Sequence, residues 1–269
     1  MKLFTVDERE LIKTQIIQVA EKNANILSAV LVGSGAIGFT DDISDLDFYL
    51  ITDSEENIFE AMKYMKEHIE KYNNPILAKQ IDERKLQVYL LQNYLEVDIG
   101  YSSINEANSD KENFKVIFDK TGKVNQLMNE TLQKYKEKII NTDIRDKFME
   151  NAGSIWHFLF HAANAIKRKQ YWRCIADMEL ARNIIIEIKG YRYSLETKRG
   201  RDVDKFPQTE LENMQKTYAT EFTQEALLQN LLYLTDWVYN ELEEYFHDYI
   251  AVNRQHVTEY INITGENLC

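Results

Sequence analysis

The sequence predicts an α+β fold in which a small domain built on a mixed β-sheet is followed by an all-α helical bundle. Only 9 of the 269 residues are glycine and 2 are proline, and a chain with so few turn-forming residues is expected to be rich in helix. Short apolar runs typical of strands are confined to roughly the first 120 residues. Beyond them, apolar residues recur every three or four positions over long stretches, which indicates packed helices.

The first domain, expected over residues 1–122, begins with a helix whose start is marked by the capping box Thr5-Val-Asp-Glu8. Its clearest strand is 46–51, where apolar residues at 46, 48 and 50 alternate with Asp47 and Tyr49. The expected elements are a helix at 6–23, strands at 26–32 and 46–51, a helix at 55–71, and strands at 77–81, 86–91, 95–101 and 116–118.

The second domain, expected over residues 123–269, contains three long stretches with helical periodicity, at 144–169, 173–189 and 224–250. A charged segment, Glu196–Asp204, separates the second stretch from the third and closes at Pro207. The helices predict a bundle that packs its apolar stripes inward.

The net charge of −12 argues against a nucleic-acid partner, because nucleic-acid binding depends on clustered Lys and Arg, and it favours a cationic small molecule. Cys174 and Cys269 form no disulfide or metal pattern. The N-terminal residues lack the apolar segment of a signal peptide, and no apolar run is long enough to span a membrane. We therefore expect a cytoplasmic protein with no membrane partner, while the oligomeric state is not indicated.

A glycine cluster is the sharpest feature of the chain. Gly33, Gly35 and Gly38 lie within six residues, directly after the strand expected at 26–32. A Gly-Ser turn at a strand end lets backbone N–H groups approach a phosphate closely, and the Ser34 hydroxyl adds a donor. Gly33 and Ser34 are therefore candidate nucleotide-binding residues.

Two aspartates, Asp45 and Asp47, follow at the start of the next strand. Side chains two residues apart on a strand share a face, so these carboxylates converge and repel each other unless a cation lies between them. Carboxylates together with substrate phosphates are ligands that Mg²⁺ prefers. A third carboxylate is expected nearby, and Asp98 is the candidate because it lies in mid-strand beside Gly100, with Glu96 on the same face as the alternative.

The pattern of Gly33-Ser34, then Asp45-x-Asp47, then an acidic residue on a later strand resembles the nucleotidyltransferase superfamily typified by DNA polymerase β. The sequence Ser44-Asp-Leu-Asp-Phe48, the chain length and the order of the two domains look like the bacterial nucleotidyltransferases that adenylylate lincosamide or aminoglycoside antibiotics. The stretch from Trp156 to Arg182 is similar to the first two helices of that group's C-terminal domain.

The resemblance implies a magnesium-dependent nucleotidyltransferase associated with antibiotic resistance. Asp45 and Asp47 would hold two Mg²⁺ ions, and Asp98 would be a metal ligand, the general base, or both. ATP or another NTP would donate its nucleoside monophosphate to a hydroxyl of a small molecule, such as an aminoglycoside or a lincosamide, and pyrophosphate would be released.

Several other residues have both a functional and a structural interpretation. Asp41 and Asp42 are interpreted as loop charges. His157 and His161, one helical turn apart, are interpreted either as packed or hydrogen-bonded histidines or as residues that face the substrate. Arg182 would pair with a carboxylate or reach the triphosphate. The basic segment Lys198–Lys205 would be a solvated loop or a clamp for ATP phosphates. The rival to the enzyme is a non-catalytic module that binds a nucleotide as a sensor.

Overall fold

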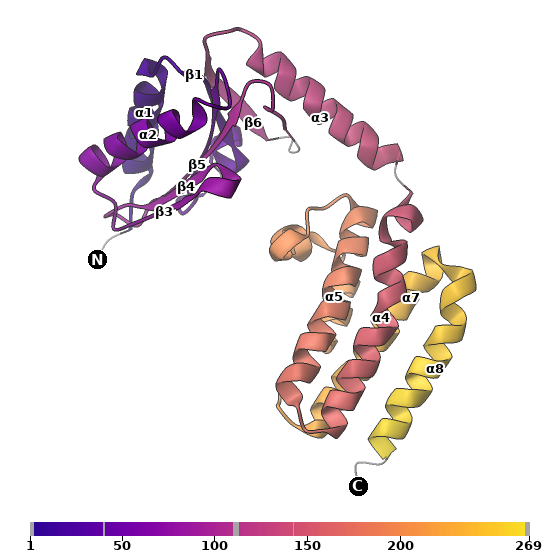
Figure 1. The fold of residues 1–269 in the computed structure, drawn as a ribbon. Helices are drawn as coiled ribbons and strands as arrows, with labels where there is room; N and C mark the ends of the chain where they lie inside the picture. Colours follow the sequence, from indigo (N-terminus) through magenta and orange to yellow (C-terminus); the bar gives the residue numbers. More distant parts are fainter. Residues whose placement is uncertain (1–2, 40, 110–112, 142, 267–269) are drawn as a thin grey trace. The chain divides into compact units, whose positions relative to one another are not determined.

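The computed structural model describes residues 3–39, 41–109, 113–141 and 143–266 (Figure 1). The chain divides into two compact units, 1–140 and 141–269. Each unit has its own hydrophobic core, one around a sheet and one among helices. The predicted α+β class is confirmed. The compact unit that contains the sheet also includes the helix that follows residue 122. A domain boundary at 122/123 stays a prediction.

The first unit is a six-stranded sheet with the order β3-β4-β5-β2-β1-β6. Its strands are β1 (Ile26–Val32), β2 (Leu46–Thr52), β3 (Leu77–Ile81), β4 (Leu86–Leu90), β5 (Glu96–Ser103) and β6 (Phe114–Asp119). The pair β2–β5 is parallel and the other four pairs are antiparallel. All the predicted strands are present, with ends that differ by one or two residues.

Helices α1 (Val6–Lys22) and α2 (Ile58–Asn73) lie against one face of this sheet (Figure 1). They bury the apolar residues of the central strands, such as Phe48 and Ile99, against Ile16 and Met62. The first turns of α3 (Val124–Asn141) cover part of the other face, where Val124 and Met128 pack on β1 and β2. The capping box predicted at Thr5 and Glu8 is formed and starts α1.

The second unit contains α4 (Ile144–Lys167), α5 (Tyr171–Tyr193), α6 (Gln208–Lys216), α7 (Gln224–Tyr245) and α8 (His247–Glu266). The prediction of one continuous helix at 224–250 is wrong, because the helix breaks at Phe246 and α8 begins at His247. Phe246 leaves the helical conformation, with φ −130° and ψ 36°, and buries its ring in the core of the bundle. The apolar periodicity runs on through the break because Phe246 faces the same core as α7.

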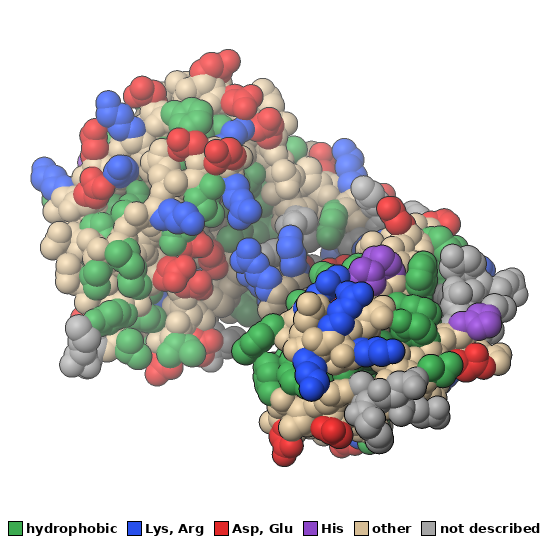
Figure 2. All heavy atoms as spheres, turned by 60° about the horizontal axis from the view of Figure 1, so that its bottom comes forward, with side chains coloured by type: hydrophobic (Ala, Val, Ile, Leu, Met, Phe, Trp, Pro, Cys, Tyr) green, Lys and Arg blue, Asp and Glu red, His purple; other side chains and the backbone are tan. Residues whose placement is uncertain are grey.

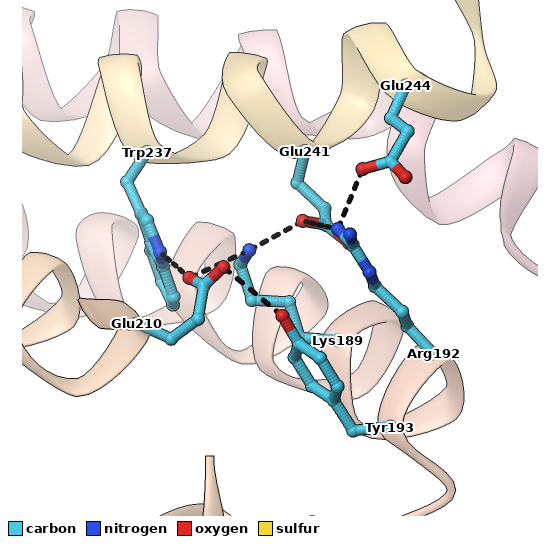
Figure 3. Close-up of polar contacts among 7 residues, drawn as sticks. All are labelled: Lys189, Arg192, Tyr193, Glu210, Trp237, Glu241 and Glu244. Atoms are coloured by element: carbon cyan, nitrogen blue, oxygen red, sulfur yellow. Dashed lines mark hydrogen bonds and ion pairs between the residues drawn. The ribbon is translucent and has the colours of Figure 1, made fainter. Parts of the chain in front are cut away.

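A network of charges lies within this helical core (Figure 3). The Lys189 ammonium, on α5, is 2.5 Å from a carboxylate oxygen of Glu241 on α7 and 2.9 Å from Glu210 on α6. The indole of Trp237 donates to Glu210 at 3.0 Å, and Arg192 bridges Glu241 and Glu244. Lys189 and Glu241 are only 3% and 2% exposed, so each charge depends on its partners for compensation.

Two simpler expectations can be set against the described residues. Cys174 is a buried free thiol in α5, whereas Cys269 lies outside the described residues. Among the helices that the structure describes, none is both long enough and apolar enough to cross a bilayer.

We expect Lys189→Met to lower the free energy of unfolding by about 3–5 kcal/mol, because it leaves buried carboxylates without their ammonium partner. Urea unfolding followed by circular dichroism measures the loss. Lys205→Met is the matched control, since Lys205 forms an exposed ion pair with Asp202, and it should cost less than about 1 kcal/mol. Equal losses in the two variants would contradict the role of the buried network.

Candidate active site

The glycine turn that follows β1 lies directly against the aspartate motif. Residues Gly33–Ile37 form a 3₁₀ turn, and Gly33 has φ +63°. A Cβ at Gly33 would lie 3.0 Å from Asp47 Oδ2. Both the backbone conformation and this contact therefore favour glycine. The predicted phosphate-binding turn and one of the predicted metal ligands are thus neighbours.

The two strands that carry the carboxylates are adjacent and parallel. In the register of β2 and β5, Asp47 is the direct partner of Asp98, and Asp45 lies just before β2 begins. Asp47 and Asp98 are half-buried on the face of the sheet opposite Phe48 and Ile99, which pack under α1 and α2. Residues separated by 51 positions in the chain are therefore brought together by a strand pairing.

The electrostatic environment of Asp98 is unfavourable for a negative charge. Burial, followed by the charges of Glu96, Asp47 and Asp45 in that order, raises the pKa of its carboxyl to about 7. Its Oδ1 atom is buried and has no hydrogen-bond partner. A cation placed among these carboxylates would lower the pKa of Asp98 and satisfy the buried oxygen.

A hard divalent cation such as Mg²⁺ needs several oxygen ligands close together. Within the described ranges, no three His, Cys, Asp or Glu side chains are grouped closely enough to hold a metal ion as they stand. Asp45, Asp47 and Asp98 nevertheless supply the hard oxygen donors that Mg²⁺ takes, and the unpartnered Oδ1 of Asp98 is an open ligand position. The residues therefore fit a magnesium ion by chemistry, with substrate phosphate oxygens as further ligands.

Arg9 holds the loop between the glycine turn and the aspartates. It was not among the residues predicted from the sequence. Arg9 is 1% exposed, and its guanidinium donates to the carbonyl oxygens of Ser44 and Asp41, both at 3.1 Å. Its Cζ lies 3.9 Å from the centre of the Phe39 ring. The sequence does contain a signal for Arg9, because this charged residue falls on the stripe of α1 that is buried together with Ile16 and Ala20.

The loop itself has further fixed points. Phe39 has φ +54°, and its N–H donates to Ser34 O at 2.9 Å. Asp41 Oδ1 accepts hydrogen bonds from the N–H groups of Ile43 and Ser44 and from the Ser44 hydroxyl, which lowers the pKa of Asp41. The interpretation of Asp41 as a loop charge therefore becomes specific, since its carboxylate closes the turn that leads into Asp45.

The candidates in the helical unit have local roles. Arg182 is buried, donates to Thr217 Oγ1 and Thr217 O, and pairs with Glu179. Of the two roles predicted for it, the structure therefore shows the pairing with a carboxylate. His161 contacts the Arg173 guanidinium at 3.3 Å, which agrees with a hydrogen-bonded histidine. His157 is exposed and lies beside His161 with ring centres 4.1 Å apart, so it is not buried in the core of the bundle, and a role facing the substrate stays a prediction.

Basic side chains are not spread evenly over this acidic chain. The segment Lys198–Lys205 forms an irregular 3₁₀ turn, in which Lys205 pairs with Asp202 and Arg199 has φ +59°. Lys and Arg side chains also gather on the end of the helical unit that faces the reader in Figure 2. The turn between α4 and α5 contributes the exposed residues Lys167, Arg168 and Lys169. The net charge of −12 therefore conceals a local basic surface.

We expect the Asp98 carboxyl to titrate near pH 7 in the metal-free chain, as ¹³C NMR of the carboxyl groups would measure. Its pKa is higher in the folded than in the unfolded chain, so the folded chain is stabilised at low pH and loses about 1–2 kcal/mol as pH rises from about 4 to 7. Asp98→Asn should remove this loss. A pKa below 5 in the presence of EDTA would contradict the assignment, and added Mg²⁺ should lower the pKa.

Loss of the Arg9 contacts should loosen the loop 38–45. We expect Arg9→Met to increase hydrogen exchange of the Phe39, Ile43 and Ser44 amides by about tenfold or more, as mass spectrometry of the exchanged chain would measure. Arg9→Lys should protect only in part, because an ammonium lacks the planar fork that spans two carbonyls. Lys13→Met is the control, since Lys13 lies 5.5 Å from the same ring without bonding the loop. Unchanged exchange in Arg9→Met would refute the role of Arg9.

The chain is similar in structure to solved nucleotidyltransferases. No protein-family model and no curated protein sequence matches it. An aminoglycoside 6-adenyltransferase from Bacillus subtilis aligns over 97% of this chain and 99% of its own, with 10% identity and a TM-score of 0.43. A nucleotidyltransferase-like protein from Exiguobacterium sibiricum aligns over 88% and 77%, with 11% identity and a TM-score of 0.38. A Thermotoga maritima CCA-adding enzyme, complexed with tRNA, aligns over 95% and 67%, with 11% identity and a TM-score of 0.31. At these values the likeness transfers no activity to this chain, and the function is argued from its own residues.

Proposed function

We propose that this chain is a magnesium-dependent nucleotidyltransferase that moves a nucleoside monophosphate, AMP from ATP, to a hydroxyl of a small molecule. One observation carries the proposal. Asp47 and Asp98 are direct partners on adjacent parallel strands, with the Gly33 turn in contact with Asp47. A phosphate-binding turn beside a pair of half-buried carboxylates is suited to a reaction at a metal-bound triphosphate.

Each residue has a role that follows from its position. Gly33 and Ser34 offer a backbone N–H and a hydroxyl to the terminal phosphates of the nucleotide. Asp45, Asp47 and Asp98 would hold Mg²⁺, which when bound neutralises the triphosphate and polarises the α-phosphorus. Arg9 keeps the loop before Asp45 in place through its hydrogen bonds to the carbonyl oxygens of Asp41 and Ser44.

Asp98 is also the candidate general base. Its carboxyl lies on the same face of the sheet as Asp47, at the proposed metal site, where bound Mg²⁺ would keep it ionised and able to accept a proton. In the transfer, the acceptor oxygen forms a bond to the α-phosphorus while the bond from that phosphorus to the bridging oxygen breaks. Pyrophosphate leaves, and the hydroxyl proton passes to the Asp98 carboxylate.

The negative charge of the site indicates which class of acceptor it would attract. The carboxylates at 45, 47, 96 and 98 make this end of the sheet strongly acidic, which attracts a cationic acceptor as well as a cation. Amine-bearing antibiotics, namely the aminoglycosides and the lincosamides, satisfy this requirement. A role in antibiotic resistance belongs to the same proposal.

Asp47→Ala should abolish pyrophosphate release, with a loss of about 10³-fold or more, because it removes a ligand of the metal without removing core packing. Pyrophosphate release from each of the four NTPs, with Mg²⁺ and a panel of amine-bearing acceptors, measures this. Asp42→Ala, a change in an exposed residue of the preceding loop, is the matched control and should keep full activity. Full turnover by folded Asp47→Ala would refute the metal assignment. Nucleotide binding without metal or pyrophosphate release would support the sensor instead.

A further inference from the structure

An aliphatic surface lies immediately beside the carboxylates, on the face of the sheet that α1 and α2 do not cover. We call it the aliphatic shelf, and it consists of Leu77, Ile81, Leu86, Val88 and Leu90. On β4, the alternate residues Gln87 and Tyr89 point to the other face, where Gln87 bonds to Met62 O of α2 at 2.9 Å. The three shelf residues of β4 are only half-buried, and Leu77 on the edge strand β3 is 64% exposed.

The register of the strands places this shelf next to Asp98. Val88 is the direct partner of Asp98 on one side, and Asp47 is its partner on the other. Residues paired across strands point to the same face, and neighbouring strands are about 4.8 Å apart. A group bound at Asp98 therefore meets aliphatic side chains within one or two strand spacings.

Charged groups limit what fits on the shelf, because Glu96 lies at its edge and Lys79 lies on the same face of β3, between Leu77 and Ile81. Glu96 is exposed, pairs with Leu90 in the ladder, and is not among the proposed metal ligands. It is therefore the carboxylate left for a cationic amine of the acceptor. Lys79 is exposed and pairs with Val88, so a second amine on the acceptor would meet a like charge there.

Gly100 is the position without a side chain between the shelf and β2. It is the direct partner of Leu86 on β4 and of Tyr49 on β2. A Cβ at Gly100 would meet Tyr49 Cδ2 at 3.7 Å and Phe48 O at 3.8 Å, which are ordinary contacts. Packing within the protein thus does not require glycine here, and a Cβ at this position would project toward a ligand bound beside Asp98.

We propose that the acceptor is an amphiphilic monoamine, whose hydroxyl lies at Asp98, whose amine pairs with Glu96 and whose aliphatic part covers the shelf. The inference rests on the proposed function and narrows its acceptor class. Wholly polar polycations fit the shelf poorly, because they would cover aliphatic side chains with hydrated groups and approach Lys79.

The test uses methyl, butyl and octyl glycosides of 2-amino-2-deoxyglucose, each with its N-acetyl counterpart. Binding to the full chain with Mg²⁺ and a non-hydrolysable ATP analogue is measured by calorimetry. We expect the Kd to fall about threefold per added methylene over the first few carbons. The amine should bind more tightly than the acetamide, and Glu96→Gln should remove that preference.

Two variants separate the shelf from the stability of the fold. Leu86→Thr/Val88→Thr keeps residues that favour strands and should reduce the gain per methylene to below about 1.5-fold. Val116→Thr, a half-buried position on the opposite edge strand β6, is the control and should keep the full gain. Gly100→Ala should leave the melting temperature unchanged and weaken acceptor binding by about fivefold or more.

Affinity that does not depend on chain length, or no binding of any glycoside while the nucleotide binds, would overturn the proposal. So would sedimentation showing a dimer that Leu86→Thr/Val88→Thr dissociates, because a second copy would then cover the shelf. Pyrophosphate release measured in parallel distinguishes failure of the proposed transferase activity from failure of the proposed shelf. A chain-length gradient without release refutes the transferase and keeps the shelf, whereas release without a gradient refutes the shelf alone.

Discussion

The parallel pairing of β2 with β5 sets Asp47 beside Asp98, and the rest of the candidate site is arranged around that contact. Like charges placed directly opposite each other in a sheet are destabilising, and burial adds to the effect, as the raised pKa of Asp98 records. Residues that repel one another in a half-buried position cost stability in the empty chain. That cost is offset when a cation binds, and groups held in this way are typical of functional sites.

The buried guanidinium of Arg9 helps to hold the loop that carries the other half of the site. Arg9 bonds two carbonyl oxygens of the loop and packs on Phe39, whose backbone in turn is bonded to Ser34. A shift of α1 would therefore be felt at both the phosphate-binding turn and the aspartates. Chemistry that depends on placing a phosphate against carboxylates gains from such a rigid support, since small displacements of reacting groups are costly.

Charge is used differently in the two units. In the sheet unit, carboxylates gather around Asp98 and raise its pKa, which suits a site for metal, nucleotide and amine. In the helical unit, Lys189 and Arg192 are matched with Glu210, Glu241 and Glu244, and these ion pairs lie within the fold (Figure 3). Like charges held close together thus mark the candidate site, and opposite charges held close together help to fix which faces of α5, α6 and α7 pack together.

The sequence alone determined the class of the fold and the chemistry of the motif. Period-two and period-3.6 patterns are local, so the strand at 46–51 and the helices from 144 onward could be predicted, as could the glycine turn and the pair Asp45 and Asp47. Asp98 was also predicted as the third carboxylate, from its place in mid-strand beside Gly100. Tertiary structure alone decided that it is the direct strand partner of Asp47, because strand pairing over 51 residues leaves no local signal. It also decided the role of Arg9, the break at Phe246 and the existence of the aliphatic shelf. Each of these depends on which surfaces meet, and a pattern along one segment does not record what is packed against it.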